Sequence, residues 1–409
     1  MGDGMGRRGG WFLLAYIAIG IAQGFTTACD GPDRLCAPLI ANTSAAPLQA
    51  IPSQGQAAPA PSQADPTLPP APTVRIALLL PLRSDTLGAP SDAVRAGFLA
   101  AYDRDRGGIT VNVIPTGDSA QDALDAYAQA VAKNDIVVGP LTRSAVSAVA
   151  TSPVQGKPTI ALNNLEVRPA GLEVAVPERM LIMGLSMEDE ARQAANWAST
   201  EPGKPVALVL ATGSAWQQRI ATAFASHWKL LGLDVSIVDL GATTNGYLQE
   251  AALLQLKAQV DANPPALVFA ALDAGQLRQV RGMLGTILPV YGTSSVNPGI
   301  GQGSATTELD GVHLVDLPWQ VHVDHPAVMA YPRLQRNTSM DMDRLYALGI
   351  DAFRVAREIA GAAGPQFTVD GVTGKLTIHF GNGPARFERQ ETGAIYQTGH
   401  FVPPASSSK

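Results

Sequence analysis

Cysteine is nearly absent from this sequence: its 409 residues include only Cys29 and Cys36. A disulfide framework and a cysteine-rich zinc site both need several cysteines in the folded part, so both are excluded. Charge is also scarce, because Asp, Glu, Lys and Arg make up 16% of the residues and the formal net charge is −6. No Lys/Arg-rich tract is present, which argues against nucleic acid as a partner.

The N-terminus has the pattern of an export signal. Arg7 and Arg8 form a basic region, the apolar run WFLLAYIAIGIA follows, and the small residue Ala28 precedes Cys29. The run is too short to span a bilayer comfortably. Residues 1–29 therefore resemble a bacterial lipoprotein signal in which Cys29 is acylated after cleavage. The alternative is an uncleaved membrane anchor. Both place the rest of the chain in the periplasm and leave open which membrane holds it.

Residues 30–72 are expected to be a tether, because they are rich in Pro, Ala, Ser and Gln and show no sustained apolar period. From Thr73 onwards, apolar strand patterns alternate with helical patterns, and Ser91 is the expected N-cap of the first helix. Such alternation is typical of βαβ units and a parallel sheet. The expected strands are 74–82, 109–116, 135–141 and 158–164, and the expected helices are 91–105, 120–133 and 143–152.

A second strand-helix series begins at residue 205. The pattern then crosses back to a helix and ends in a hairpin that turns at Gly381–Gly383. These two series predict an α/β protein with two doubly wound parallel-sheet lobes, folded over residues 73–404. The expected bounds are about 73–183 and 318–365 for lobe one, about 184–316 for lobe two, and about 370–390 for the C-terminal hairpin.

Glu188, Asp189 and Glu190 are consecutive acids at the start of a helical pattern. Consecutive residues point in different directions around a helix, so the three carboxylates cannot face one metal ion. Ser186 followed by Asp189 matches the S-x-x-[DE] capping pattern, and acids in a first turn are favoured by the helix dipole. The cluster is therefore interpreted as a helix start.

Motifs for catalysis or metal binding are lacking. No G-x-S-x-G, phosphate-binding loop or H-E-x-x-H pattern occurs. His322, Asp324 and His325 could bind a metal, but a solvated loop is favoured because further ligands are not nearby. The sequence thus predicts no enzyme, no cofactor and no metal site.

Polar residues follow three strands of the first series, where ligands bind in open α/β sheets. Helix capping is the alternative role for such residues. The candidates for a ligand cleft between the lobes are Ser84, Asp85, Thr86, Gly139, Pro140, Thr142, Asn163 and Asn164.

Several stretches in order resemble one family. They include IALLLPL, DIVVGPLTRSAVSAVA, TIALNN, GLSMEDEARQAA, LDGVHLVDLPW and RLYALGIDAFRVA. This chain is similar, from Val74 to about Arg389, to the periplasmic-binding-protein-like domain of the LpoA-type penicillin-binding protein activators. The resemblance implies a type I periplasmic-binding fold and a non-catalytic lipoprotein that stimulates a class A penicillin-binding protein. Family members carry an N-terminal helical-repeat domain where this chain has the tether, which leaves open whether the activating contact is the same.

The alternative function is a tethered solute-binding protein that delivers an amino acid or a similar small ligand to an ABC importer. In amino-acid binders of this fold, loop hydroxyls hold the α-carboxylate and an acid of the other lobe holds the ammonium. Ser84, Thr86 and Thr142 would take the first role, and Asp273 would take the second. Both functions share the fold, so the fold cannot decide between them.

A partner surface is expected in the Pro-punctuated segment from Asp316 to Arg336, because protein interfaces favour aromatic and Arg anchors. The candidate anchors are Trp319, Tyr331, Arg333 and Arg336. Burial of Trp319 between the lobes is the alternative for that residue. The two arginines are expected at the surface.

Overall fold

The architecture is that of a computed structural model. It describes residues 73–154, 156–166, 174–200, 203, 205–299, 307–334 and 339–404. The expected signal, Cys29, the tether and Arg336 lie outside these residues. Within the described residues, no helix combines the length and the apolar character needed to cross a membrane.

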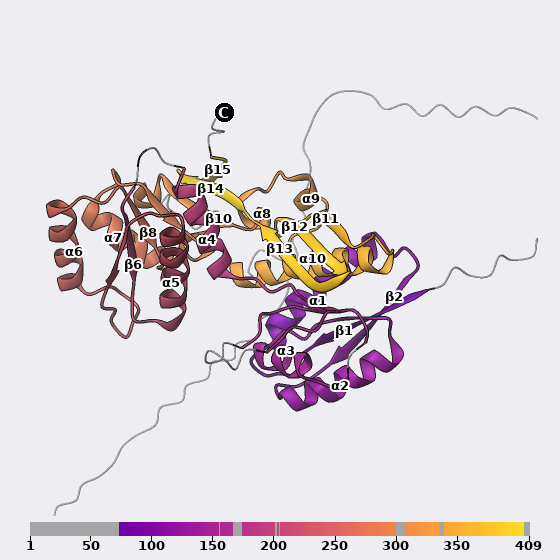
Figure 1. The fold of residues 1–409 in the computed structure, drawn as a ribbon. Helices are drawn as coiled ribbons and strands as arrows, with labels where there is room; N and C mark the ends of the chain where they lie inside the picture. The colour runs from indigo at the N-terminus through magenta and orange to yellow at the C-terminus, as the bar shows by residue number, and fades with distance from the viewer. Residues whose placement is uncertain are drawn as a thin grey trace, which may run out of the picture. The chain divides into compact units, whose positions relative to one another are not determined.

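The first strand series forms a parallel five-stranded sheet in the order β2-β1-β3-β4-β5 (Figure 1). We call this sheet and the elements packed on it lobe one. Its strands are β1 (Val74–Leu80), β2 (Ile109–Pro115), β3 (Ile136–Val138), β4 (Thr159–Ala161) and β5 (Met180–Ile182). Its helices are α1 (Gly88–Arg104), α2 (Ala120–Lys133), α3 (Arg143–Ala150) and α10 (Met340–Ala360).

Strand β1 is buried on both faces, as its continuous apolar run predicts. Ile76, Leu78 and Leu80 belong to a core that includes residues of α1 and α10. Ala77 and Leu79 belong to a second core, with residues of α2 and α3. Helices therefore cover both faces of the sheet, which is the doubly wound arrangement.

Helices α1 and α10 approach closely because each has a glycine at the contact. A Cβ atom at Gly97 would collide with the backbone carbonyl of Tyr346, and one at Gly349 would collide with the carbonyl of Val94. The contact is completed by Phe98 against Phe353, with ring centroids 5.3 Å apart. The two glycines thus set how closely α10 lies against the rest of lobe one.

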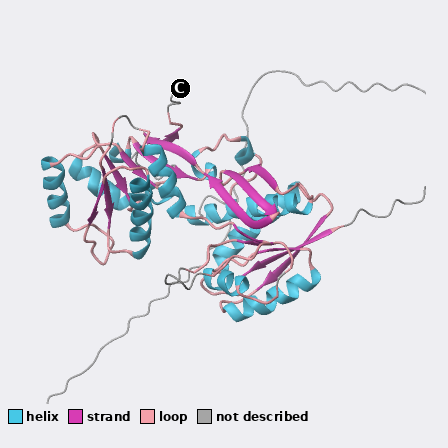
Figure 2. Cartoon of the chain, in the orientation of Figure 1, coloured by secondary structure: helices cyan, strands magenta, loops and turns pink. Residues whose placement is uncertain are grey.

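The second series forms a separate seven-stranded sheet in the order β15-β14-β10-β9-β8-β6-β7, which defines lobe two. Its two faces pack in different cores, one with residues of α4 and α5 and the other with residues of α6 and α7. Figure 2 shows strands of the fold flanked by helices. The strands are β6 (Ala207–Ala211), β7 (Val235–Asp239), β8 (Leu267–Ala270), β9 (Val290–Gly292), β10 (Val312–Asp316), β14 (Thr392–Gln397) and β15 (His400–Val402). The helices are α4 (Met187–Ala198), α5 (Ala215–Leu230), α6 (Glu250–Ala262) and α7 (Ala274–Leu284).

The chain passes between the lobes three times: after β5, after β10 and after β13. A third, antiparallel sheet precedes the last passage, and its residues Val369, Leu376 and Ile378 join the core of lobe one. It consists of β11 (Gln366–Asp370), β12 (Lys375–Gly381) and β13 (Gly383–Gln390). Short helices lie in the connections: η1 (Ser294–Val296), η2 (Thr307–Leu309), α8 (Pro318–Val321) and α9 (Pro326–Met329).

The expected α/β class with two parallel-sheet lobes is confirmed, and so is the hairpin turn, where Gly381 pairs with Gly383. The expected N-cap Ser91 is wrong. Helix α1 starts at Gly88, and Ser91 lies inside it, fully buried, with no hydrogen-bond partner for its hydroxyl. Strands β5, β11, β14 and β15 have no counterpart among the expected elements.

Candidate functional site

The polar residues after β1 shape the turn into α1. Ser84 is buried, and its Oγ accepts a hydrogen bond from Leu87 N at 2.8 Å. The same Oγ lies 3.3 Å from Thr86 Oγ1. Asp85 and Thr86 are exposed. The buried hydroxyl of this turn is therefore engaged by the backbone.

The residues after β3 also have structural roles in the backbone of this turn. Gly139 has φ of 110°, and a Cβ atom there would collide with the carbonyl of Leu79, so only glycine fits. A cis peptide bond joins Gly139 to Pro140. Thr142 is the N-cap of α3, and its Oγ1 accepts a hydrogen bond from Ala145 N at 3.2 Å.

The remaining ligand candidates are hydrogen-bonded locally. Asn163 Nδ2 donates to Leu141 O at 2.9 Å, and Asn163 Oδ1 accepts from Asn164 N at 2.9 Å. Asp273 is the N-cap of α7, where it forms a capping box with Gln276. Ser84, Thr142 and Asp273, which were expected to hold an amino acid, thus accept hydrogen bonds from backbone N–H groups at turns and helix starts, while the Thr86 hydroxyl contacts that of Ser84.

A cavity of about 650 Å³ opens between residues of the two lobes. None of the nine predicted cleft residues, all of them described, is among those that line it. Arg143, next to Thr142, and Trp216 at the start of α5 do line it. The other lining residues are Leu185, Met187, Glu188, Glu190, Arg219, Ser294, Ser295, Asn297, Leu317, Met340, Asp341, Arg344 and Leu345.

A buried ionic network connects the lobes beside this cavity. Arg344, from α10 of lobe one, donates through Nη2 to Asp316 Oδ2 at 2.8 Å and to Ser294 O at 3.0 Å. Asp316 Oδ2 also accepts from Asn297 Nδ2 at 2.7 Å. Glu190 Oε2 accepts from Ser294 N at 2.7 Å. Asp316 is fully buried and Glu190 nearly so.

Burial, together with the neighbouring Asp316 carboxylate, raises the pKa of Glu190 to about 8. The hydrogen bond from Ser294 and the charge of Arg344 act in the opposite direction, and burial prevails. Sequence reasoning missed this role of Glu190. The signal was its spacing, because Glu190 stands four and eight residues before Ala194 and Ala198 and so shares their buried helix face.

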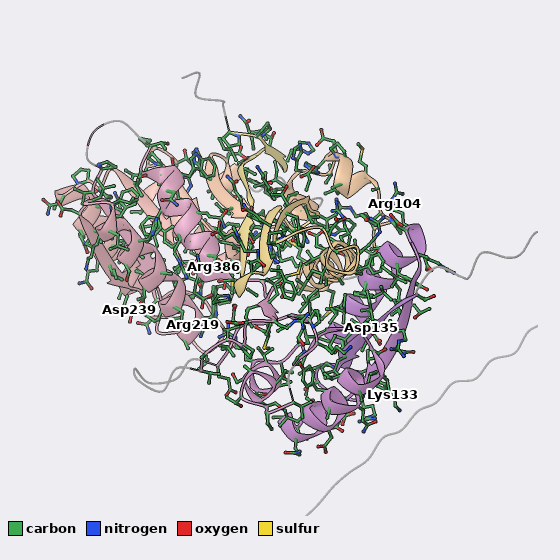
Figure 3. All side chains as sticks on the ribbon, turned by 45° about the vertical axis from the view of Figure 1, so that its right-hand side comes forward. Arg104, Lys133, Asp135, Arg219, Asp239 and Arg386 are labelled. Atoms are coloured by element: carbon green, nitrogen blue, oxygen red, sulfur yellow. The ribbon has the colours of Figure 1, made fainter. Side chains whose placement is uncertain are left out.

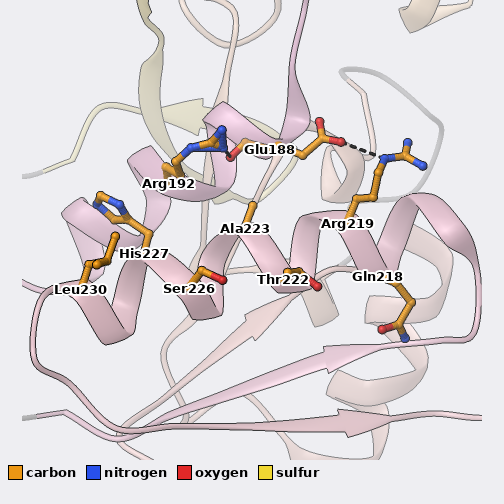
Figure 4. A pocket seen from close by; sticks show the side chains of 9 residues that line it. All are labelled: Glu188, Arg192, Gln218, Arg219, Thr222, Ala223, Ser226, His227 and Leu230. Carbon is orange, nitrogen blue, oxygen red and sulfur yellow. Dashed lines mark hydrogen bonds and ion pairs between the residues drawn. The ribbon is translucent and has the colours of Figure 1, made fainter. Parts of the chain in front are cut away.

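The start of α4 is capped as predicted: Ser186 Oγ accepts from Asp189 N at 3.1 Å. The three acids point in different directions. Glu188 pairs with Arg219 of α5 at 2.9 Å, the exposed Asp189 pairs with Arg192 at 3.2 Å, and Glu190 is buried. Glu188 and Arg219 also border a groove of about 610 Å³ along α4 and α5, which is shown in Figure 4; Arg219 is also labelled in Figure 3.

The expected partner segment is only partly at the surface. Trp319 is fully buried, so its ring is not a surface anchor, and Tyr331 is half-buried. The Arg333 guanidinium lies over the Trp319 ring, 4.0 Å from its centroid, and donates to Trp319 O. Burial lowers the pKa of Arg333. Arg333 is exposed, as expected, and it also holds the segment together through its contacts with Trp319.

Each histidine of the HVDHP stretch faces its own aspartate. His322 Nε2 lies 3.3 Å from Asp324 Oδ1, and His325 Nε2 lies 3.5 Å from Asp370 Oδ1. His325 Nδ1 accepts from Ala327 N at 3.2 Å and so caps α9. Among the described residues, no three His, Cys, Asp or Glu side chains are grouped so that they could hold a metal ion.

The comparison with protein families decides the assignment. The family model "LppC putative lipoprotein" matches residues 57–399. This chain is a member of the LppC family. LppC relatives named penicillin-binding protein activator LpoA include one from Histophilus somni, 28% identical over 349 residues, and one from Escherichia coli, 26% identical over 307 residues. These matches cover 80% and 66% of this chain and 54% and 44% of the relatives, so the chain spans about half the length of the curated relatives it matches.

Two solved structures extend this comparison of the LppC chain. One is described as the C-domain of Haemophilus influenzae LpoA, "a regulator of PBP1A". It is 26% identical with a TM-score of 0.64, and the match covers 81% of this chain and 100% of that one. The other, from Chromobacterium violaceum, is described as a "putative branched-chain amino acid ABC transporter". It is 33% identical with a TM-score of 0.62, and the match covers 79% of this chain and 100% of that one.

Proposed function

We propose that this chain is a non-catalytic envelope lipoprotein that binds and stimulates a class A penicillin-binding protein. The observation that carries the proposal is the match to the whole C-domain of Haemophilus influenzae LpoA, the regulator of PBP1A. The curated relatives named as activators support it over most of this chain. Stimulation would come from contact with the synthase.

The absence of catalysis is supported by how the acids are used. General acid-base catalysis needs a carboxyl group within reach of a substrate. Glu188 is paired with Arg219, Asp316 is fully buried under Arg344, and Glu190 is held by a backbone N–H. These groups stabilise contacts between elements, which supports a structural use of the acids.

We further propose that the chain is anchored in the periplasm through acylated Cys29, with residues 30–72 as the tether and residues 73–404 as one two-lobed domain. The family description as a lipoprotein supports the anchor. The separate sheets of the two lobes and the three passages between them support the domain.

The test of the proposed function is a reconstituted synthesis assay. Purified full-length protein is added in detergent to a class A penicillin-binding protein, and glycan polymerisation and cross-linking are measured. We expect the rate to rise several-fold at saturation. An unchanged rate, with no capture of the synthase in a pull-down, would contradict the proposal.

A matched pair of variants locates the contact. Met329 of α9 is 65% exposed in the expected partner segment, whereas Ile287 of lobe two is 94% exposed and lies outside that segment. Both substitutions, Met329→Glu and Ile287→Glu, change one exposed apolar side chain, so folding should be little affected. We expect Met329→Glu to weaken synthase capture and Ile287→Glu to leave it unchanged. The reverse result would place the contact on lobe two.

A solute-binding role is the second candidate, and the identity of 33% to the Chromobacterium violaceum structure favours it. The cavity of about 650 Å³ is large enough for a small ligand. However, the side chains of Ser84, Thr142 and Asp273 accept hydrogen bonds from backbone N–H groups, and these residues do not line the cavity. Calorimetric titration with amino acids and with muropeptides tests this role: saturable heat with an amino acid and no effect on the synthase would favour it.

A further inference from the structure

A buried carboxyl group stands at or beside each of the three passages between the lobes. Glu190 lies in α4 shortly after the first passage, Asp316 ends β10 at the second, and Glu391 lies between β13 and β14 at the third. Glu190 is 4% exposed and Asp316 0% exposed. Glu391 Oε2 is buried and has no hydrogen-bond partner. Each passage therefore has a carboxyl group withdrawn from water at or beside it.

Two guanidinium groups accompany these acids. Arg344 binds Asp316 and Ser294 across the lobes, as described above. Arg389, at the end of β13, donates to Gly184 O at 2.8 Å, which connects the third passage to the first. Gln193 of α4 strengthens the same connection, because its Oε1 accepts from Glu391 N at 2.9 Å and its Nε2 donates to Arg389 O at 3.2 Å.

The acids outnumber the bases in this cluster, which holds three carboxyl groups and two guanidinium groups. Further carboxylates lie around this cluster and interact with its two arginines. Asp189 of α4 and Asp351 of α10 act on Arg389, and Asp341 pairs with Arg344 at 3.1 Å. The other bases around the cluster already face other acids. Arg354 pairs with Asp351 at 3.2 Å, Arg219 pairs with Glu188 at 2.9 Å, and Arg143 acts on Glu188 as well. Full ionisation would thus leave uncompensated negative charge in a buried place.

Uncompensated buried charge is costly, so the acids respond by keeping protons. Burial raises the pKa of Glu391 well above its ordinary value, and Glu190 adds to the rise while Arg389 opposes it. Burial likewise raises the pKa of Glu190. Asp316 is held by Arg344, and burial favours the protonated form of both glutamates.

We propose that Glu190, Asp316 and Glu391 form a proton-dependent latch, which holds the three passages together when the glutamates are neutral and lets the lobes separate when they ionise. Ionisation would place like charges on all three passages at once. Repulsion and the demand for hydration then act first on the connections, because the two sheets pack in different cores, which meet at α8 with Trp319 in one and Val321 in the other. Lobe separation relieves both without unfolding either lobe.

The test is a distance measurement between the lobes as a function of pH. Exposed Lys133 of α2 and Asp239 of β7, both labelled in Figure 3, are replaced by Cys for spin labels in the full chain, with Cys29 and Cys36 changed to Ser. Double electron-electron resonance is recorded from about pH 6 to about pH 9.5, across the raised carboxyl titrations. We expect longer and broader distances at high pH, with a midpoint near about 8.

The variant Glu190→Gln with Glu391→Gln should keep the low-pH distances throughout. Glu188→Gln, which alters an acid paired outside the cluster, should respond as the wild type does. If the double variant does not fold, Glu190→Gln alone should move the midpoint to lower pH, because it removes a charge that raises the pKa of Glu391. A wild-type distance that is independent of pH, or an unchanged response in these variants, overturns the proposal.

Discussion

Glu190 illustrates how a single buried side chain acquires a role that its neighbours do not share. Glu188 and Asp189 make ion pairs at the helix surface, while Glu190 enters the core beside Asp316. The capping pattern at Ser186 was enough to predict the helix start. It could not predict the partners of Glu190, because Ser294, Asp316 and Arg344 lie more than 100 residues away in sequence.

The raised pKa of Glu190 predicts that stability falls as pH rises. Below the ordinary carboxyl pKa both the folded and the unfolded state hold the proton, so Glu190 does not make the free energy of unfolding depend on pH. Between about 4.5 and about 8 the unfolded state releases it and the folded state keeps it, and the free energy of unfolding decreases. The slope is at most about 1.4 kcal/mol per pH unit for one group, and it ends above the folded pKa.

Urea unfolding at several pH values measures this effect in the wild type and in Glu190→Gln. The variant should show a flatter dependence between about pH 5 and about pH 8, because Gln does not titrate. Glu188→Gln is the matched control and should keep the wild-type slope. Equal slopes in the wild type and Glu190→Gln would show that Glu190 is ionised in the folded protein.

At the scale of elements, the contact between α1 and α10 depends on two glycines. Gly349→Ala would force a methyl group against the carbonyl of Val94, so the helices must move apart. We expect a loss of about 2–3 kcal/mol in the free energy of unfolding. Gly282→Ala in α7, where nothing lies near the added methyl group, should stabilise by about 0.5–1 kcal/mol because alanine favours helix. Thermal or urea unfolding of both variants measures these changes. A Gly349→Ala variant as stable as the wild type would refute the tight contact.

The order of strands and helices could be predicted because it depends on local periodicity. β1 is an uninterrupted apolar run, and α2 begins at an N-cap Ser, so both are encoded within a few residues. β14 and β15 were missed because they follow the predicted hairpin and pair with β10 and with each other, far from the other strands of lobe two in sequence. The prediction for Ser91 was wrong because a serine just before a helical apolar pattern is typical of an N-cap but can also lie inside the helix. In this protein Ser91 is inside α1 and buried.

At the scale of the whole molecule, the proposed anchor predicts where the protein is found. If Cys29 carries a lipid, Cys29→Ala should move the protein from the membrane fraction to the soluble periplasmic fraction, because the acyl chains supply the membrane affinity. Cys36→Ala is the control and should leave the protein in the membrane fraction. Fractionation followed by immunoblotting measures both. Membrane association that persists in Cys29→Ala would favour an uncleaved anchor.

The three passages between the lobes also determine when each lobe can form during synthesis. The strands of lobe one leave the ribosome first, but α10, which covers one face of their sheet, follows only after β6 to β10 have been made. Lobe two waits still longer, because β14 and β15 come last. Neither lobe can bury its core from one uninterrupted stretch, so a nascent chain stopped before α10 holds two unfinished halves. Such a chain exposes apolar surface and an unpaired edge at β10, which makes truncated products substrates for proteolysis and aggregation.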